Sequence, residues 1–392
     1  MRLLSACSNS EVKGFVFIVY QLGILSEMER VDVVCAPGLE SLVAKELQDL
    51  GLAGGLSFQG PLREVYRANL YLGCAERVLV RLGSFRAAVF PEFRRKAAKL
   101  PWERFLVPGR PITLRVSCLR SRLYHESAVA ERLAGAVEDR LKRPSPVKKH
   151  GEETGPELAQ MIVARFEDDL CTISLDSSGE PLHRRGYRLA SAKAPLKESL
   201  AFAMLKASGW DAASPLMDPF CGSGTVAIEA ALLAKKAVPG RSRRFAFMVW
   251  PGFDAGLWEG LLARAGGDAA GSTPRILASD RDAGAVRAAQ ANAERAGVSG
   301  LIEFSCKALS AIEPPPAPGW IVTNPPYGVR LKGTKDLRDL YARFGQVLRA
   351  KCPGWHAAVL CGDLRLMRSA GLSYKTELSS MNGGLKVSLA VV

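Results

Sequence analysis

The chain has 392 residues, of which 48% are hydrophobic and 23% are charged, as in ordinary globular proteins with two or three domains. Its 53 lysines and arginines exceed its 39 aspartates and glutamates, and the net charge of +14 favours an anionic partner, nucleic acid before membrane. Nine cysteines without a C-x-x-C pair and four histidines without metal-ligand spacing argue against a metal site and indicate reduced thiols in a cytoplasm.

An apolar run at residues 14–25 is too short to span a bilayer, and no small-residue cleavage site clearly follows it. We therefore expect residues 1–28 to be a disordered extension, with Met28 as the natural start, and we expect no membrane contact. A targeting peptide is the open alternative.

Between residues 29 and 188 strand-like and helical patterns mix without a phosphate-type glycine loop, which predicts an α+β region. The strand-like stretches are 31–38, 111–118 and 170–179, the helical ones are 38–51 and 125–143, and residues 63–85 read as a helix running into a strand.

Residues 86–149, which we call the basic window, contain 16 lysines and arginines against 6 acidic residues. Five aromatic residues are interleaved with these cations: Phe90, Phe93, Trp102, Phe105 and Tyr124. Such interleaving predicts a surface that tracks RNA phosphates, although a solvated basic face over an ordinary core would give the same composition.

From about Ser214 the chain alternates between strands and helices, which predicts an α/β, parallel, doubly wound sheet with ligands at the carboxyl ends of its strands. The expected strands are 214–218, 275–280, 301–305, 319–324 and 356–362, and the expected helices are 224–236, 282–297 and 336–350. Asn382-Gly383-Gly384 predicts a terminal hairpin.

The segment "MDPFCGSGT", residues 217–225, places Asp218 at the end of a strand and glycines in the turn before a helix. It matches neither G-x-x-x-x-G-K-[ST] nor G-x-G-x-x-G, which disfavours a nucleoside triphosphate or a dinucleotide. A carboxylate beside the turn would repel phosphate but suits a ligand with cationic and hydroxyl groups. S-adenosylmethionine has both and lacks phosphate.

Asp280 ends the next strand, where a carboxylate can accept hydrogen bonds from two ribose hydroxyls. Its alternative role is the N-cap of the following helix, for which Asp282 competes. The position in the repeat favours ribose binding.

The segment "NPPY", residues 324–327, forms a stiff, extended corner after a strand, because each proline fixes its own φ and restricts the residue before it. The Asn324 side-chain oxygen and the Pro325 carbonyl could accept the hydrogens of an exocyclic amine and stabilise charge developing on its nitrogen. Pro326 keeps these acceptors rigid, and Tyr327 could stack on the base, a contact worth about 1–3 kcal/mol.

Together these motifs make the chain similar to the THUMP-domain class I methyltransferases that produce N2-methylguanine in RNA, most of all to the bacterial branch that acts on 23S rRNA. The resemblance runs from about Val31 to the C-terminus and rests on "APGLESLVAKEL", "DPFCGSGTVAIEAALLA", "SDRDAGAVRAAQANAERAGV", "NPPYGVRL" and "NGGL". It implies a ferredoxin-like plus THUMP RNA-binding region at 29–188 and a Rossmann-like methyltransferase domain at 189–392. The family also implies a seven-stranded sheet in that domain and a monomer bound to 23S rRNA or the assembling large subunit.

By the same resemblance, Asp218, Phe220, Gly222 and Gly224 form the cofactor loop and Asp280 binds the ribose. Asn324, Pro325, Pro326 and Tyr327 hold the target base. The family also places "LHRRGYR", residues 182–188, before the catalytic domain, which suggests that Arg184, Arg185 or Arg188 contacts RNA phosphate.

One departure from the family lies after the third strand of the repeat, where related enzymes carry an acidic residue near the cofactor adenine. This chain has Lys307 and Ala308 there. Three alternatives therefore stay open: a tRNA guanine-N2 methyltransferase, an adenine-N6 methyltransferase on nucleic acid, and an RNA-binding assembly factor without activity.

Overall fold

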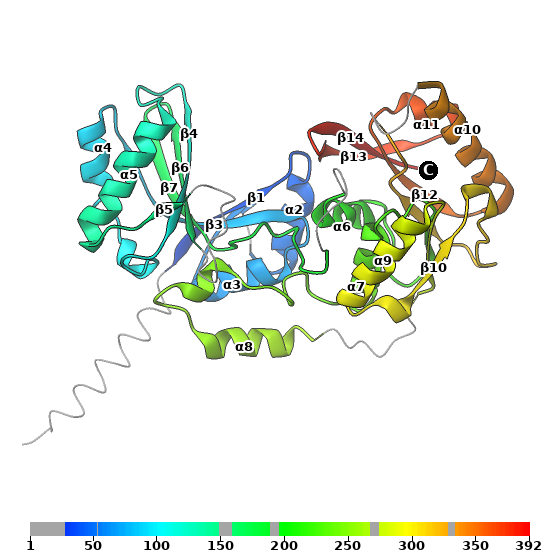
Figure 1. The fold of residues 1–392 in the computed structure, drawn as a ribbon, viewed down its shortest axis with the longest axis horizontal. Helices are drawn as coiled ribbons and strands as arrows, with labels where there is room; N and C mark the ends of the chain where they lie inside the picture. The colour runs from blue at the N-terminus through cyan, green and yellow to red at the C-terminus, as the bar shows by residue number, and fades with distance from the viewer. Residues whose placement is uncertain (1–27, 53, 149–158, 189–195, 267–273, 328–333) are drawn as a thin grey trace, which may run out of the picture.

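The computed structural model describes residues 28–52, 54–148, 159–188, 196–266, 274–327 and 334–392. In this part of the chain two seven-stranded sheets lie in the two halves of the molecule (Figure 1). None of the described helices is long and apolar enough to cross a membrane. The expectation for the N-terminal extension lies outside the described residues, except for Met28.

The first sheet has the strand order β2-β1-β3-β7-β6-β4-β5. Its strands are β1 (Glu29–Cys35), β2 (Ser57–Gly60), β3 (Ala75–Arg86), β4 (Ile112–Leu119), β5 (Val147–Lys148), β6 (Gln160–Glu167) and β7 (Leu170–Asp176). The long strand β3 pairs antiparallel with β1 on one side and with β7 on the other, so one continuous sheet joins both parts of the N-terminal half.

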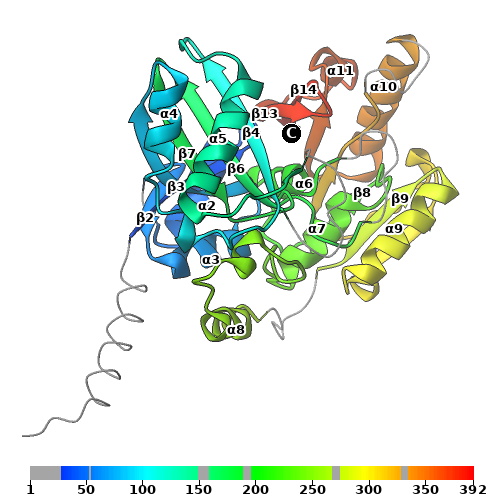
Figure 2. The same ribbon diagram turned by 60° about the vertical axis from the view of Figure 1, so that its left-hand side comes forward.

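Helices cover this sheet as the apolar periodicity requires. They are α2 (Glu40–Asp49), α3 (Leu62–Tyr71), α4 (Phe90–Ala97), η1 (Trp102–Arg104) and α5 (Glu126–Leu141). Val43 and Leu47 of α2 are fully buried, and Gly51 after it has a φ of +74°, which glycine adopts without strain. Helices α4 and α5 pack side by side over β4, β6 and β7 (Figure 2).

The second sheet has the order β10-β9-β8-β11-β12-β14-β13 and confirms the predicted Rossmann-like domain. Its strands are β8 (Leu216–Asp218), β9 (Ile276–Asp280), β10 (Ile302–Cys306), β11 (Trp320–Thr323), β12 (His356–Cys361), β13 (Lys375–Asn382) and β14 (Leu385–Val391). Strands β8 to β12 are mutually parallel, whereas β14 pairs antiparallel with β12 and β13. The carboxyl ends of the parallel strands therefore meet at one edge of the sheet.

Most helices of the second half lie on the two faces of this sheet, whereas two of them pack against the N-terminal half. The helices of this half are α6 (Glu198–Ala207), α7 (Thr225–Ala234), η2 (Ala246–Val249), α8 (Ala255–Arg264), α9 (Ala283–Arg295), η3 (Ser299–Leu301), η4 (Leu309–Ala311), α10 (Thr334–Lys351) and α11 (Arg365–Ser369). Along β11, Ile321 packs into the core beneath α10, while Val322 packs into the core on the opposite face. This alternation is what a strand buried on both faces requires.

Side chains of the two halves pack against each other. Helix α8 lies beneath α3 in both ribbon views (Figures 1 and 2). The ring of Tyr66 on α3 stacks on Phe247 of η2 at 4.4 Å between ring centroids and meets Trp258 of α8 edge-on at 6.3 Å. On the other side, Gly38 lies against β13 so closely that a Cβ there would stand 1.7 Å from the Ser379 carbonyl oxygen.

These contacts do not test the expected division at residues 188 and 189, because residues 189–195 lie outside the described part. The division into 29–188 and 189–392 remains our proposal. The structure adds that residues 240–258, between α7 and β9, pack against the N-terminal half.

The basic window differs from its sequence prediction in two respects. Phe93, Trp102 and Phe105 are buried in the core and are not available to stack on RNA bases, while Tyr124 is 65% exposed. Many of the cations are also paired: Arg94 with Asp139, Lys96 with Glu92, Arg104 with Glu29, Arg120 with Glu167 and Asp168, and Arg140 with Glu103. Acidic residues outside the window neutralise part of its charge, which composition alone could not reveal.

Candidate active site

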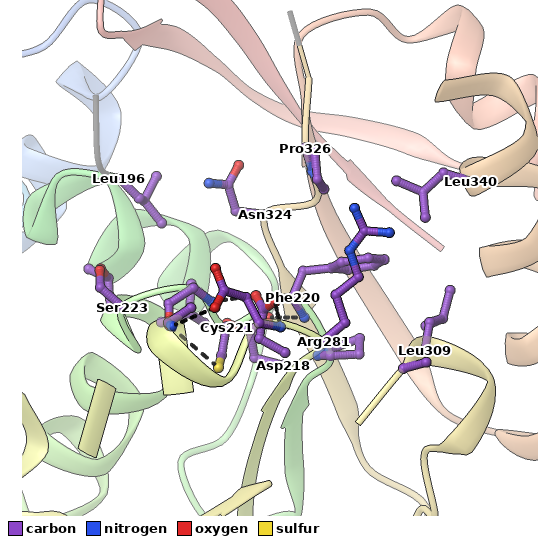
Figure 3. Close-up of a pocket in the computed structure, with 18 of the residues that line it drawn as sticks. Leu196, Asp218, Phe220, Cys221, Ser223, Arg281, Leu309, Asn324, Pro326 and Leu340 are labelled. Atoms are coloured by element: carbon purple, nitrogen blue, oxygen red, sulfur yellow. Dashed lines mark hydrogen bonds between the residues drawn. The ribbon is translucent and has the colours of Figure 1, made fainter. Parts of the chain in front are cut away.

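A cavity of about 1220 Å³ lies at the carboxyl ends of β8, β9 and β11 (Figure 3). Six of the predicted site residues line it: Asp218, Phe220, Gly222, Asp280, Asn324 and Pro326. Gly224, Pro325 and Tyr327 are not among its lining residues. The loop after β8, the end of β9 and the corner after β11 therefore converge on one space, as the sequence predicted from three separate motifs.

Asp218 ties the loop after β8 to the corner after β11. Its Oδ1 accepts hydrogen bonds from the Thr323 hydroxyl at 2.6 Å and from the Phe220 backbone N–H at 3.2 Å. Burial raises the pKa of Asp218 to about 7, and the nearby negative charge of Asp280 also raises it. The sequence did not single out Thr323, although it directly precedes Asn324.

Asp280 organises the rim of the cavity with both carboxylate oxygens. Its Oδ2 accepts from the Gly222 backbone N–H at 3.0 Å, and its Oδ1 accepts from the Asp282 backbone N–H at 3.0 Å. Asp282 is the N-cap of α9, accepting from the N–H groups of Gly284 and Ala285. The cap alternative for Asp280 is therefore wrong, and its remaining lone pairs are available to ligand hydroxyls.

Gly222 and Gly224, in the loop after β8, have different structural roles. A Cβ on Gly222 would meet nothing within 4 Å, so the backbone there borders open space. A Cβ on Gly224, by contrast, would stand 2.9 Å from the Cβ of Ala289 on α9. Gly222 thus leaves room for a ligand, whereas Gly224, with a φ of +82°, allows α7 and α9 to approach.

Asn324 presents an unused acceptor at the upper edge of the cavity in Figure 3. Its Oδ1 is buried and has no hydrogen-bond partner among the residues that the structure describes. A buried amide oxygen without a partner costs folding free energy, and such groups in native proteins call for an explanation. A ligand N–H group would satisfy it.

Tyr327 is only 9% exposed, and its hydroxyl accepts a hydrogen bond from Asn382 Nδ2 at 2.8 Å. Its ring lies against Gly362, just beyond β12. The predicted stacking of Tyr327 on a base stays a prediction, because this side chain does not line the cavity.

Two of the three arginines of residues 182–188 have roles other than the one predicted for them. Arg185 is 5% exposed and donates to the carbonyls of Leu182 and Gly73. Arg188 donates to the Thr225 hydroxyl at 2.6 Å and to the Leu196 carbonyl, and both of these residues line the cavity. Internal contacts thus occupy Arg185 and Arg188, so their assignment to RNA phosphate is wrong.

Arg184 is the arginine of this segment for which the phosphate prediction remains open. Its side chain is 66% exposed and pairs with Glu180.

Two cavity residues that the sequence reasoning missed are Arg281 and Arg343. Both are exposed and line the cavity, and in the described part of the chain neither guanidinium has a hydrogen-bond or ion-pair partner. Two sequence features could have identified them: Arg281 directly follows Asp280, and Arg343 lies three residues after Leu340 on α10. Ala308 also lines the cavity and Lys307 pairs with Glu313, so no carboxylate follows β10 at this point.

Comparison with known proteins places this site in a family. A family model described as "RMKL-like, methyltransferase domain" matches residues 185–390, and a model of the "RlmL ferredoxin-like domain" matches residues 32–79. The chain belongs to the RMKL-like methyltransferase family. The expected fold is thereby confirmed, and the family assignment replaces the broader resemblance stated above.

Among RMKL-like relatives, the chain is 34% identical to slr0064 of Synechocystis sp., provisionally named an RNA methyltransferase, over 90% of this chain and 94% of that protein. It is 36% identical to the ribosomal RNA large subunit methyltransferase K/L of Methylococcus capsulatus over 90% of this chain and 49% of the relative. The chain thus spans about half the length of the K/L relative. The crystal structure of SMU.472, provisionally named a methyltransferase and complexed with SAH, matches with a TM-score of 0.82 and 29% identity, covering 93% and 98% of the two chains.

These findings confirm S-adenosylmethionine as the cofactor. The residues present fit it: Asp280 offers acceptors for ribose hydroxyls, Gly222 leaves open space at the backbone, and the loop carries no phosphate-binding lysine. When bound, the cofactor supplies an electrophilic methyl group. Among the described residues, no group of three or more histidines, cysteines, aspartates or glutamates could hold a metal ion.

Replacing Asp280 by alanine is expected to weaken binding of S-adenosylhomocysteine by at least about tenfold, because a hydrogen bond to a charged acceptor contributes about 1.5–3 kcal/mol. Isothermal titration calorimetry measures this directly. Asp254→Ala is the matched control, since it removes the cap of α8 outside the cavity, worth about 1 kcal/mol of stability, and should change the affinity much less. Equal losses in the two variants would contradict the ribose assignment.

Proposed function

We propose that this protein transfers a methyl group from S-adenosylmethionine to the exocyclic N2 of a guanine in 23S rRNA. The observation that carries the proposal is the buried Oδ1 of Asn324 at the edge of the cofactor cavity, to which no described residue donates a hydrogen bond. An exocyclic amine donates hydrogen bonds and becomes cationic as it is methylated, so a fixed acceptor serves both its ground state and its transition state.

The surrounding residues support this chemistry by fixing geometry. The Thr323–Asp218 hydrogen bond links the corner directly to the loop after β8, which sets the direction from which the amine meets the methyl group. Asn324 Oδ1 and the Pro325 carbonyl then accept the two amine hydrogens and direct the nitrogen lone pair. As the new N–C bond forms, the bond from the same carbon to the cofactor sulfur would break with its electron pair left on sulfur, giving S-adenosylhomocysteine, and one amine proton would be lost to solvent.

Nucleic acid is the substrate class that best fits the charges of the cavity. The carboxylates of Asp218 and Asp280 line the cofactor side, and the cavity is also lined by Arg281 and Arg343, whose guanidinium groups pair with no described residue. Arginine binds phosphate oxygens through planar, two-pronged hydrogen bonds. We infer that these cations receive the backbone next to the target nucleotide.

We propose 23S rRNA over tRNA because of the named relatives, which are ribosomal RNA large subunit methyltransferases. The part of the N-terminal half from α4 to β7 would be the THUMP region, and it offers the exposed aromatic pair Tyr124 and His125, with ring centroids 4.1 Å apart. This function would place the protein in the cytoplasm with the assembling large subunit.

Methyl transfer to unmodified 23S rRNA fragments, followed by nucleoside analysis, tests the function. We expect N2-methylguanosine, and we expect no product when inosine, which lacks the amine, replaces the target guanine. N6-methyladenosine would support the adenine alternative, and preferential labelling of tRNA transcripts would support the tRNA alternative. No labelling of any RNA would support the assembly-factor alternative.

A further inference from the structure

The terminal hairpin reaches back to the catalytic corner through one buried side chain. Asn382 is the last residue of β13, directly before the turn at Gly383 and Gly384, whose φ angles are +57° and +82°. Its side chain is 6% exposed, and its Nδ2 donates to the Tyr327 hydroxyl at 2.8 Å across 55 positions of sequence.

Tyr327 is held on two sides. Asn382 holds its hydroxyl, and Gly362 lies against its ring so closely that a Cβ there would make a tight contact, 3.2 Å from the Tyr327 ring carbon Cδ2. Tyr327 lies three residues after Asn324, with the two stiff prolines between them. Because the two prolines are rigid, a displacement of the Tyr327 side chain also displaces the corner.

The hairpin formed by β13 and β14 is held in place by contacts with the N-terminal half and between its own strands. The Ser379 carbonyl of β13 lies against Gly38 of the N-terminal half, and the Ser379 and Ser388 hydroxyls are 2.9 Å apart across the hairpin. A side chain on such an element is fixed more accurately than one on a free loop.

An asparagine at this buried position costs free energy of folding. Its Oδ1 is buried without a hydrogen-bond partner in the described part of the chain, while its Nδ2 makes the bond to Tyr327. A leucine would fill similar space without leaving an unsatisfied carbonyl. The bond to Tyr327 is the compensating interaction that the structure shows.

We propose that Asn382 is a positioning residue for methyl transfer, which acts by holding the Tyr327 hydroxyl and thereby fixing the Asn324 and Pro325 acceptors. This inference rests on the proposed function, because it concerns the same amine acceptors. It assigns the Tyr327 hydroxyl a role that is separate from any stacking by the Tyr327 ring.

Tyr327→Phe separates the two roles. A phenyl ring stacks on a base as a phenol ring does, so stacking alone predicts the wild-type rate, whereas loss of the anchor predicts a lower one. Displacements of about 1 Å can cost 10²-fold in rate, so we expect the single-turnover rate to fall by about 10–100-fold in both Tyr327→Phe and Asn382→Ala. The affinities for S-adenosylhomocysteine and for RNA should stay within about threefold of the wild type.

The double variant decides whether both residues act through one bond. Because each single change already removes the bond, Tyr327→Phe combined with Asn382→Ala should lose no more than one single variant. Tyr374→Phe is the matched control: the Tyr374 hydroxyl donates to the Leu364 carbonyl at 3.3 Å and makes no hydrogen bond to the corner within the described part of the chain, so its loss should leave the rate unchanged.

Hydrogen exchange gives a readout that does not depend on activity. Peptides covering residues 319–327 should exchange faster in Asn382→Ala than in the wild type, and not in Tyr374→Phe. A wild-type rate in Tyr327→Phe, multiplicative losses in the double variant, or unchanged exchange would each overturn the proposal. If wild-type protein produced N6-methyladenosine, the guanine assignment would fail while this test stayed valid, because the same acceptors serve that amine.

Discussion

Asn324→Ala is expected to lower the single-turnover rate of methyl transfer by about 10²–10³, the usual cost of removing one fixed hydrogen-bond partner of a developing charge. The affinity for S-adenosylhomocysteine should change little, because the ribose acceptors belong to Asp280 at the end of a different strand. Folding should not suffer, since the variant removes a buried amide oxygen to which no described residue donates.

The matched variant is Asn324→Asp, which keeps an acceptor and adds a negative charge. A carboxylate can stabilise an amine that is becoming cationic, so this variant should keep more activity than Asn324→Ala. Tritiated methyl transfer in single turnover, with calorimetry on the same preparations, measures both quantities. A wild-type rate in Asn324→Ala would mean that the corner is only a turn.

Much of this site could be predicted from sequence because each motif sits at a strand end. A parallel sheet brings such ends to one edge, so Asp218, Asp280 and Asn324 had to converge once the strand–helix repeat was recognised. The N-cap role of Asp282 was also predictable, because this residue directly precedes an alanine-rich helix.

What the sequence could not provide were contacts between segments far apart in the chain. Arg185 and Arg188 lie in a basic run, and only the folded chain shows that they serve the interface and the cavity wall. Phe93 and Trp102 interleave with cations in the sequence but point into the core. The bond between Asn382 and Tyr327 likewise depends on the hairpin folding back against β12, which no local pattern encodes.

Arg185→Met is the variant for which we expect the largest loss of stability. Arg185 lies in a buried cluster, where its Nε is 3.8 Å from Glu229 Oε1, and the Tyr187 hydroxyl donates to the same oxygen at 3.0 Å. Glu198 and Arg188 adjoin this cluster, and their side chains pair at 3.2 Å. Removing one partner of a buried ion pair typically costs 3–5 kcal/mol, because the other charge stays uncompensated.

The loss should depend on pH in a defined direction. Burial raises the pKa of Glu229 to about 7, even though Arg185 opposes that shift. A carboxyl whose folded pKa is raised binds its proton more tightly in the folded state, so its favourable contribution is complete below the unfolded value of about 4.3 and is lost as pH rises to about 7. Without Arg185 the pKa of Glu229 rises further, and the variant is penalised most where wild-type Glu229 is ionised.

Urea unfolding of Arg185→Met at pH 6 and pH 8.5 tests this expectation, with a greater fall in free energy of unfolding at pH 8.5. Arg184→Met is the control, because Arg184 is the neighbouring residue, its side chain is 66% exposed, and its pair with Glu180 is a surface pair. Exposed pairs contribute about 0–1 kcal/mol, so this variant should unfold nearly as the wild type does at both pH values. A small, pH-independent loss in Arg185→Met would show that Glu229 remains protonated throughout and that Arg185 acts only through its hydrogen bonds to the Leu182 and Gly73 carbonyls.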